Sequence, residues 1–250
     1  IDGLTGLPNR RLLNDLFQEE IAAVRQRRGS ISVCFLDLDG FKSINDHQGH
    51  AAGDSVLKCV ADRLRGAVRH HDVVARLGGD EFVAILRDVE HPRVYRHILD
   101  QLRRPMHIHG HPLELSASMG ITRYPHDDSD SDLLLRHADQ AMYTAKESGK
   151  NCYHFFDLES HHSQQERFAI GAQIQRALDD DQLALYYQPK IDYKTGRVSG
   201  FEGLIRWHHP SGELIYPGRF LPYIEHTNID IEVGKRVISQ AVSTLETFQK

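Results

Sequence analysis

Over the first 157 residues, apolar positions switch between helical spacing and short buried runs. Residues 8–28 and 50–69 carry apolar side chains every three or four positions, which predicts amphipathic helices. Between them, ISVCFLDLD at 31–39 is typical of a buried strand, and its two carboxylates lie near its C-terminal end. The same reasoning predicts helices at 91–104 and 130–148 and strands within 106–123 and 152–156.

Two further apolar runs, DVVARL and EFVAIL, lie on either side of Gly78 and Gly79. Two strands joined by a short glycine turn form a β-hairpin. The resulting order of strands, hairpin and helices is typical of an α/β (α+β) sandwich, in which helices flank a central, mainly antiparallel sheet. We predict this fold for residues 1–157.

After residue 157 the pattern changes. Residues 158–182 are polar with helical spacing, which predicts a helical connector. A new strand pair follows in LALYYQPKID and VSGFEGLIRW, separated by a KTGR turn, and a helical pattern covers 229–249. Two strands are too few for an independent α/β domain, so we expect 183–250 to be the truncated N-terminal part of a larger one.

Charge limits the class of ligand. The 250 residues include 35 acidic and 30 basic side chains, for a net charge of −5, and the basic ones are not grouped into blocks. This distribution argues against a nucleic-acid polymer as partner. It remains compatible with a small phosphorylated ligand held through metal ions.

No apolar run approaches the ~18 residues that cross a bilayer, and no signal peptide pattern is present. We therefore expect a cytoplasmic segment, with any membrane contact made only by regions outside it, as in an inner-membrane-anchored parent protein. The cysteines Cys34, Cys59 and Cys152 are far apart and are expected to be reduced, buried thiols.

Four carboxylates stand where two predicted elements end. Asp37 and Asp39 close the strand at 31–39, and Asp80 and Glu81 lie at the tip of the hairpin. If the two elements are neighbours in the sheet, these acids converge and repel each other unless a cation lies between them, and Mg²⁺ with phosphate oxygens is suited to that position. The alternative is an ordinary tight turn with solvated acids. Composition alone does not decide between the two.

The order and spacing of several motifs decide between the metal site and the ordinary turn. They are DGLTGLPNRR at 2–11, FLDLDGFKSIND at 35–46, GHAAGD at 49–54, RLGGDEF at 76–82 and AKESGKN at 145–151. Together they resemble the GGDEF domain family of diguanylate cyclases across almost all of residues 1–157. The resemblance implies a fold like that of nucleotidyl cyclases and polymerase palms, and condensation of two GTP molecules to cyclic di-GMP.

The resemblance also implies roles for individual residues. Two Mg²⁺ or Mn²⁺ ions per active site would be held by Asp37, Asp80 and the Leu38 carbonyl, with Glu81 as a further metal ligand or base. Guanine would be recognised by Asn45 and Asp54, with His50 beside them, and Gly78 and Gly79 would leave room for the nucleotide. Phosphate charge would be neutralised by Lys42, which we group with Asp80 and Glu81 as catalytic, and by Lys146 and Lys150. The family often has arginine at position 150, so a bidentate contact is missing there.

Each protomer of such an enzyme binds one GTP, so the resemblance implies a homodimer for catalysis. It also gives a meaning to RHHD at 69–72. By itself this tetrapeptide is a solvated helix end, but the family places its product-inhibition motif RxxD at this spacing. Arg69 and Asp72 are therefore expected to bind cyclic di-GMP.

The later segment resembles the beginning of the EAL family of cyclic di-GMP phosphodiesterases. The matching stretches are YQPKID, FEGLIRW and PGRFLPYIE. Glu202 would be a metal ligand, Leu204 completes a motif that reads Glu-Gly-Leu here, and Gln188 and Arg206 would contact phosphate. The family's other catalytic residues are expected further along, so this segment by itself is an incomplete phosphodiesterase.

The chain has 17 histidines, and His107, His109 and His111 alternate as ligands on one strand face would. A hairpin turn at Gly110 would instead separate them, and we favour solvated turn histidines.

Two hypotheses about function follow from the sequence. The first is a GTP-condensing cyclase within a GGDEF–EAL signalling protein. The second is a non-cyclising module that senses GTP or cyclic di-GMP and regulates an attached EAL phosphodiesterase.

Overall fold

The computed structural model describes residues 1–108 and 110–248, which form two compact units. Unit 1 comprises Ile1–Leu158 and unit 2 comprises Glu159–Lys250. The predicted borders of the connector, at 157 and 182, stay a prediction.

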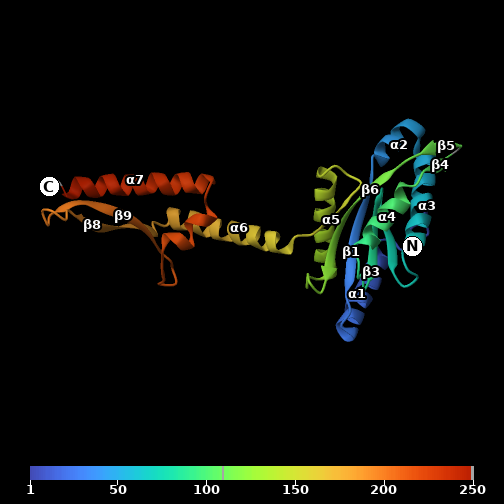
Figure 1. Ribbon diagram of the computed structural model, residues 1–250, viewed down its shortest axis with the longest axis horizontal. Helices are drawn as coiled ribbons and strands as arrows, with labels where there is room; N and C mark the ends of the chain where they lie inside the picture. Colours follow the sequence, from blue (N-terminus) through green and yellow to red (C-terminus); the bar gives the residue numbers. More distant parts are fainter. Residues whose placement is uncertain (109, 249–250) are drawn as a thin grey trace. The chain divides into compact units, whose positions relative to one another are not determined.

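Unit 1 is a five-stranded sheet in the order β2-β3-β1-β6-β7 with helices on both faces (Figure 1). Only β6 and β7 pair in parallel. This arrangement confirms the predicted α/β fold with a mainly antiparallel sheet. Its elements are α1 (Arg10–Arg27), β1 (Ile31–Asp39), α2 (Phe41–Gln48), α3 (His50–Ala67), β2 (Val73–Gly78), β3 (Glu81–Arg87), α4 (Arg93–Arg103), β4 (Met106–Ile108), β5 (His111–Leu113), β6 (Ser116–Tyr124), α5 (Ser131–Glu147) and β7 (Tyr153–Phe155).

The central strand β1 is apolar on both faces because helices cover both. Cys34 and Leu36 belong to a core shared with α3 and α4, whereas Val33 and Phe35 belong to a second core shared with α1 and α5. Side chains of a strand alternate between faces, so the odd-numbered residues of β1 face α1 and α5. Asp37 continues this odd series and therefore lies on the α5 face.

Local capping fixes where the helices over this face begin. Asn9 caps α1, and its Oδ1 accepts a hydrogen bond of 3.0 Å from the Leu12 amide. Asp130 caps α5 in the same way, accepting from the Leu133 amide at 2.9 Å. Asn and Asp are favoured at these positions because they satisfy backbone N–H groups that have no partner within the helix.

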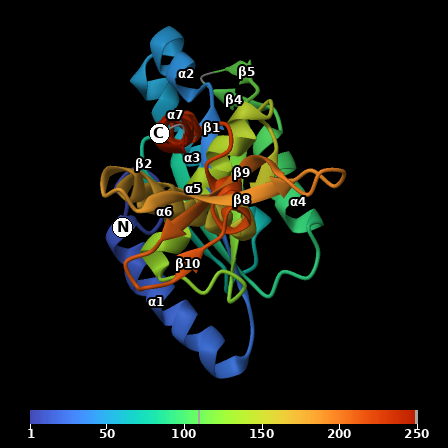
Figure 2. The same cartoon turned by 90° about the vertical axis from the view of Figure 1, so that its left-hand side faces the viewer.

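The sequence patterns missed one helix. The short helix α2 begins one residue after β1 and contributes to the core only the buried Phe41 and the partly buried Ile44, which are too few to show a repeated apolar spacing. Figures 1 and 2 both show α2 and α1 at opposite ends of unit 1. The C-terminal end of β1, with its carboxylates, therefore lies at the α2 end of the unit.

A buried polar cluster closes the turn between β6 and α5. Asp127 accepts hydrogen bonds from Thr122 Oγ1 at 2.8 Å, Ser129 Oγ at 2.6 Å and His137 Nδ1 at 2.7 Å. The ring of His137 stacks on Phe156 with 4.0 Å between ring centroids. Burial raises the pKa of Asp127, but the hydrogen bonds from Ser129, His137 and Thr122 outweigh it and lower the pKa below the ordinary 3.8.

We expect Asp127→Asn to lower the free energy of unfolding of unit 1 by about 2 kcal/mol at pH 7, because a carboxamide cannot accept from all three donors. A carboxylate with a lowered pKa stabilises the fold above its unfolded pKa, and this stabilisation is lost as the pH falls through the folded value. The difference between the two proteins should therefore shrink below about pH 4. Urea denaturation at several pH values measures it. Asp128→Asn, at the exposed neighbouring position, is the control, and an equal effect of both variants would contradict the account.

Unit 2 is a three-stranded antiparallel sheet in the order β10-β9-β8 packed with helices. Its elements are α6 (Leu158–Asp179), β8 (Leu183–Ile191), β9 (Val198–His208), β10 (Leu214–Ile215), the 3₁₀ turns η1 (Pro217–Arg219) and η2 (Leu221–Tyr223), and α7 (Asn228–Phe248). The two predicted strands are β8 and β9, and β10 adds a two-residue edge. Ile174 and Ala177 of α6 join a small core with Trp207 and Phe220. The C-terminal half of α6 is thus part of the fold of unit 2.

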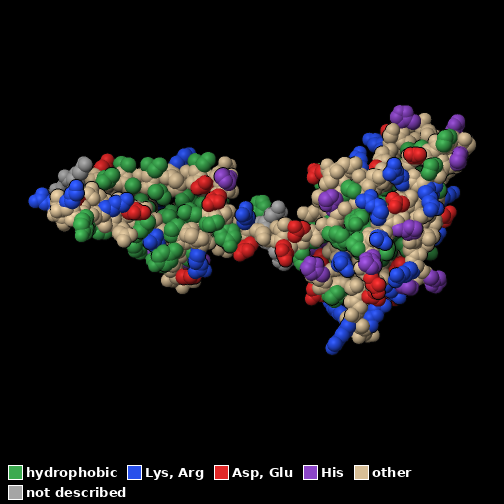
Figure 3. All heavy atoms as spheres, viewed as in Figure 1, with side chains coloured by type: hydrophobic (Ala, Val, Ile, Leu, Met, Phe, Trp, Pro, Cys, Tyr) green, Lys and Arg blue, Asp and Glu red, His purple; other side chains and the backbone are tan. Residues whose placement is uncertain are grey.

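Charged side chains of both signs are spread over the face of the protein in Figure 3, and hydrophobic side chains are prominent on unit 2. Among the described residues, no helix has the length and apolar character needed to span a membrane. Cys34 is buried, while Cys59 and Cys152 are half-buried, and all three are free thiols. Burial raises the pKa of the Cys34 thiol far above its ordinary value.

Candidate active site

The carboxylates at the ends of β1 and β3 lie next to each other. The two strands pair antiparallel, and Asp37 is the direct cross-strand partner of Glu81. Directly paired residues project from the same face of a sheet. Asp80 precedes Glu81 in the turn, and its charge acts on both of these carboxylates. The predicted convergence of acids at one edge is therefore present.

The turn itself depends on its glycines. Gly78 and Gly79 have φ angles of 153° and 51°, which are in the range that disfavours residues with a side chain, and the β2–β3 register shifts between Arg76 and Gly78. Arg76 holds the turn, since its Nη2 donates to the Gly79 carbonyl at 2.8 Å. Its Nη1 donates to both carboxylate oxygens of Asp2 at 3.1 Å. Arg76 thus joins the signature turn to the first motif of the chain, a link that the sequence did not reveal.

Lys146, near the end of α5, supplies positive charge to this edge. Its Nζ lies 2.8 Å from Oδ1 of Asp37. Burial raises the pKa of Asp37; the hydrogen bond from Lys146 opposes this rise and the nearby charge of Asp80 adds to it. Lys146, which was predicted to bind phosphate, therefore forms an ion pair with Asp37, which was predicted to bind metal.

Glu81 experiences a similar environment. Burial raises its pKa above the ordinary 4.5, the charges of Asp139 and Asp37 raise it further, and Arg10 lowers it. A raised carboxylate pKa means that burial and the neighbouring negative charges disfavour the ionised form. The site thus favours an additional cation.

The donor set fits Mg²⁺. Mg²⁺ takes oxygen ligands and is usually held by one or two protein carboxylates together with phosphate oxygens and water. Asp37, Asp80 and Glu81 offer only oxygen donors, and Leu38 follows the last residue of β1 that pairs with β3. Within the described part of the chain, no group of three His, Cys, Asp or Glu side chains is arranged to enclose a metal ion by itself. An ion at this edge would need ligands from a bound phosphate.

Asp39 has a different role from its neighbour Asp37. Its carboxylate accepts from Ser116 Oγ at 2.6 Å, Ser118 Oγ at 2.7 Å and the Asn151 amide at 3.2 Å. It is thus occupied in tying β1 to β6 and to the loop after α5. That loop contains Lys150, which has a left-handed φ of 63°. The sequence grouped Asp39 with the converging acids, whereas the structure uses it to hold the lysine loop.

The proposed guanine residues lie on α2 and α3. The side chain of Asn45 packs against Gly53 at the start of α3, and Asp54 is the next residue, exposed to solvent. His50, the first residue of α3, is also exposed, as are Lys42 and Lys150. Neither of these two lysines forms an ion pair within the described residues. The structure thus brings Asn45 against Gly53, the residue before Asp54, but leaves Lys42 and Lys150 without ion pairs to the acids among the described residues.

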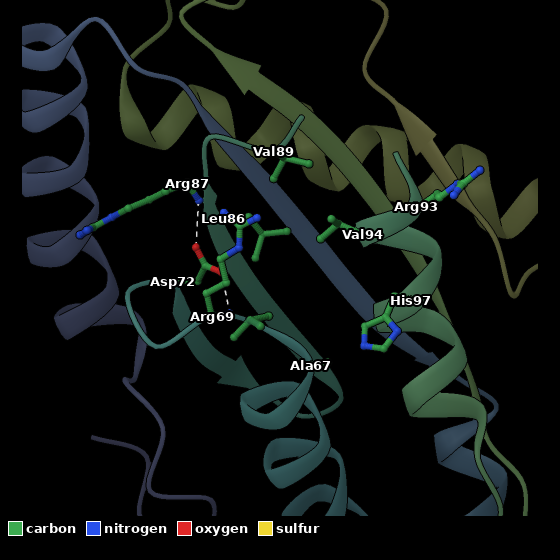
Figure 4. Close-up of a pocket in the computed structure, with 10 residues that line it drawn as sticks. Ala67, Arg69, Asp72, Leu86, Arg87, Val89, Arg93, Val94 and His97 are labelled. Carbon is green, nitrogen blue, oxygen red and sulfur yellow. Dashed lines mark hydrogen bonds between the residues drawn. The ribbon is translucent and has the colours of Figure 1, made fainter. Parts of the chain in front are cut away.

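Arg69 and Asp72 line a separate pocket of about 300 Å³ between α3, β3 and α4 (Figure 4). Asp72 accepts from the backbone amides of Arg69 at 2.8 Å and Arg87 at 2.9 Å, so its carboxylate fixes the loop. Figure 4 shows the side chain of Arg87 pointing away from the pocket, where it forms a salt bridge with Glu20. Arg69 is exposed and its guanidinium forms no ion pair among the described residues.

In unit 2 the strand register places the predicted residues on one face. Gln188 pairs with Glu202, Tyr186 with Leu204 and Ala184 with Arg206. Because partners and every second residue share a face, Gln188, Glu202, Leu204 and Arg206 all lie on the same side of the β8–β9 pair. Glu202 lies 3.5 Å from Lys190, and the Arg206 guanidinium lies over the Tyr216 ring at 4.6 Å.

The histidines at 107–111 flank a hairpin formed by β4 and β5. Ile108 pairs with His111, and His107 pairs with Pro112, so His107 and His111 project from opposite faces. The third, His109, lies outside the described residues.

Comparison with known proteins agrees with this geometry. Residues 1–152 match the family described as "Diguanylate cyclase, GGDEF domain", and residues 172–250 match the EAL domain. The bifunctional diguanylate cyclase/cyclic di-GMP phosphodiesterase MucR of Pseudomonas aeruginosa is 41% identical over 96% of this chain and 36% of its own length. The cyclic di-GMP phosphodiesterase NbdA of the same organism is 35% identical over 99% of this chain and 32% of its own length. The chain thus spans about a third of these relatives.

Solved structures agree for unit 1. The GGDEF domain of YfiN (TpbB) from P. aeruginosa matches with a TM-score of 0.61 and 36% identity, covering 66% of this chain and 98% of that one. The GGDEF domain of DgcB from Caulobacter crescentus, solved in complex with c-di-GMP, matches with a TM-score of 0.56 and 28% identity, covering 62% and 94%. The chain therefore belongs to the GGDEF family of diguanylate cyclase domains over residues 1–152 and continues, from residue 172, into an EAL domain.

Proposed function

We propose that unit 1 condenses two GTP molecules to cyclic di-GMP within a GGDEF–EAL signalling protein. The observation that carries the proposal is the edge where Asp37 and Glu81 are cross-strand partners beside Asp80, with Lys146 at 2.8 Å from Asp37. In each half-reaction a ribose 3′-hydroxyl oxygen forms a bond to the α-phosphorus of the other GTP. The bond from that phosphorus to the bridging oxygen breaks, and pyrophosphate leaves.

The acidic residues of this edge have two tasks in the proposed reaction. Asp37, Asp80, Glu81 and the Leu38 carbonyl would hold two Mg²⁺ or Mn²⁺ ions, which when bound supply positive charge to the phosphates and to the attacking oxygen. Glu81, whose pKa is raised by burial and neighbouring charge, is also suited to accept the proton of the 3′-hydroxyl. Lys146 would exchange its contact with Asp37 for the nucleotide phosphates, assisted by Lys42 and Lys150.

Guanine selectivity is assigned to α2 and α3. A carboxylate at Asp54 can accept hydrogen bonds from N1 and N2 of guanine, and Asn45 lies beside it. Adenine lacks these donors and would leave the acceptors unpaired, which costs more than a missing contact alone. The positive-φ glycines Gly78 and Gly79 present only backbone where the nucleotide approaches, and His50 starts the same helix as Asp54.

The proposed catalytic species is a homodimer, because one chain offers one such edge and the product contains two guanylate units. Cyclic di-GMP would also bind at Arg69 and Asp72 and inhibit the enzyme from the pocket in Figure 4. The solved DgcB domain contains c-di-GMP, and SiaD was solved with its activator SiaC, so relatives bind the same product or a protein partner.

A second function is favoured by the names of the relatives. NbdA of P. aeruginosa is 35% identical to this chain, and PdeR of Escherichia coli is 37% identical. Both are named as cyclic di-GMP phosphodiesterases. In this alternative, unit 1 binds GTP or cyclic di-GMP without turnover and regulates the completed EAL domain. Exposed Lys150, where the family often has arginine, supports it because a lysine gives a weaker phosphate contact.

One assay separates the two functions. The chain, and the longer protein that includes its upstream region, are incubated with GTP and Mg²⁺, and products are identified by mass spectrometry. Cyclic di-GMP and pyrophosphate are expected, and EDTA should abolish both. GTP binding without product from either protein would favour the sensing module and overturn the cyclase.

We expect Arg69→Ala to relieve product inhibition. Removing the exposed guanidinium takes away a charge-assisted contact to phosphate, so the cyclic di-GMP concentration for half-inhibition should rise about tenfold or more. The initial rate without product should stay unchanged, because Arg69 lines a different pocket from the acidic edge. Initial rates across added cyclic di-GMP measure this. Arg103→Ala, exposed on α4, is the matched control, and unchanged inhibition in Arg69→Ala would contradict the assignment.

A further inference from the structure

Gly53 lies buried in the first turn of α3, directly against the side chain of Asn45 from α2. A Cβ atom at position 53 would lie 2.0 Å from Asn45 Oδ1 and 3.2 Å from Phe41 Cζ. The φ angle of Gly53 is outside the left-handed region, so its backbone would accept a side chain. Glycine is therefore needed at position 53 because of the neighbouring Asn45 amide and not because of the backbone conformation.

Asn45 is fixed through its backbone, and its side-chain amide packs against Gly53. Its backbone carbonyl accepts from the Gly49 amide at 2.9 Å, which fixes the α2–α3 corner. Its side-chain Oδ1 is buried against Gly53 and has no hydrogen-bond partner among the described residues. A buried acceptor without a partner is costly. Packing against Gly53, and not a hydrogen bond within the described residues, therefore sets where this amide lies.

We propose that Gly53 is a positioning residue that sets the Asn45 amide for the guanine edge and thereby contributes to base selectivity. The proposal rests on the function proposed above, in which Asn45 and the adjacent Asp54 recognise guanine. Gly53 contacts no nucleotide atom itself. It acts by leaving the space that the Asn45 amide occupies against the helix.

If Gly53 had only a structural role, Gly53→Ala would lower the melting temperature. The positioning role predicts that it does not. The atom that an added methyl group would meet most closely is the far end of the flexible Asn45 side chain, which can rotate away, and the Phe41 ring at 3.2 Å needs to shift by only a few tenths of an ångström. Both helices can therefore stay in place. Alanine also has a higher helix propensity than glycine. Gly53→Ala should therefore keep or raise the melting temperature while the amide moves out of position.

The test uses the full chain and titration calorimetry with the Mg²⁺ complexes of the α,β-methylene analogues of GTP and ATP. Gly53→Ala is expected to bind the GTP analogue about tenfold more weakly, with ATP-analogue binding unchanged. Gly66→Ala, in the same helix with nothing within 4 Å of the added atom, is the matched control and should bind as the unaltered chain does. In an Asn45→Ala background, Gly53→Ala should have no further effect on binding, because the group that it displaces is gone.

Three results would overturn the inference. Gly53→Ala could bind the GTP analogue as tightly as the unaltered chain, it could lower the melting temperature, or it could cause a further tenfold loss in the Asn45→Ala background. If the unaltered chain itself fails to prefer the GTP analogue over the ATP analogue, the proposed guanine site falls and the inference falls with it. The unaltered chain therefore separates failure of the proposed function from failure of the Gly53 assignment.

Discussion

Asp80→Asn is expected to lower the rate of cyclic di-GMP formation by about 10²- to 10³-fold, the range found when one stabiliser of transition-state charge is removed. The carboxylate lies in the turn next to Glu81 and its charge acts on Asp37. The amide is almost the same size but cannot balance the charge of a metal ion. Rates at saturating GTP and Mg²⁺ give the comparison.

The fold of the variant should be intact. Asp80 is half-buried, and its side chain makes no hydrogen bond within the described residues, so little stability depends on it. Asp128→Asn removes the same charge from the exposed turn beyond the far end of β6 and should leave the rate unchanged. An Asp80→Asn protein that retains the full rate would remove Asp80 from the site.

Gly120→Ala is expected to have the largest effect on stability, a loss of about 3 kcal/mol or more in the free energy of unfolding of unit 1. A Cβ at this position in β6 would lie 1.9 Å from the Ala138 carbonyl oxygen and 2.1 Å from the Met142 nitrogen. Both atoms belong to the backbone of α5 and cannot rotate away. The helix would have to move off the sheet, which would also displace Lys146 at its end.

Urea denaturation followed by far-ultraviolet circular dichroism measures this loss. Gly66→Ala, where nothing lies within 4 Å, is the control and should be neutral or slightly stabilising. The fluorescence of Trp207, the single tryptophan of the chain, reports the core of unit 2 and serves as an internal reference. A stability of Gly120→Ala equal to that of the unaltered chain would show that α5 can shift on the sheet without cost.

The positions changed in these two variants also show which structural features can be predicted from the sequence and which cannot. The acids at the end of β1 and at the hairpin tip were predicted to converge if the strands were neighbours, and the Asp37–Glu81 pairing confirms that they are. Strand and helix types followed from apolar periodicity because both faces of the sheet are covered. The requirement for glycine at 120 depends on how closely α5 approaches β6, which no local pattern encodes.

The features that the sequence missed are long-range contacts of polar side chains. Arg76 meets Asp2 across 74 positions, and Asp39 meets Ser118 across 79. Such pairs carry no periodic signal, because each partner is a polar residue whose type alone does not indicate a distant contact. The short helix α2 was missed for a related reason: only Phe41 of its residues is buried, so its position depends on contacts with α3.

The most direct test of the account is a crystal structure of the chain with Mg²⁺ and the α,β-methylene analogue of GTP. Metal ions are expected against the carboxylates of Asp37 and Asp80, guanine against Asn45 and Asp54, and Lys146 moved from Asp37 to the phosphates. A nucleotide bound with its phosphates away from the acidic edge, or without metal at Asp37 and Asp80, would contradict the central claim that these strand ends form the active site.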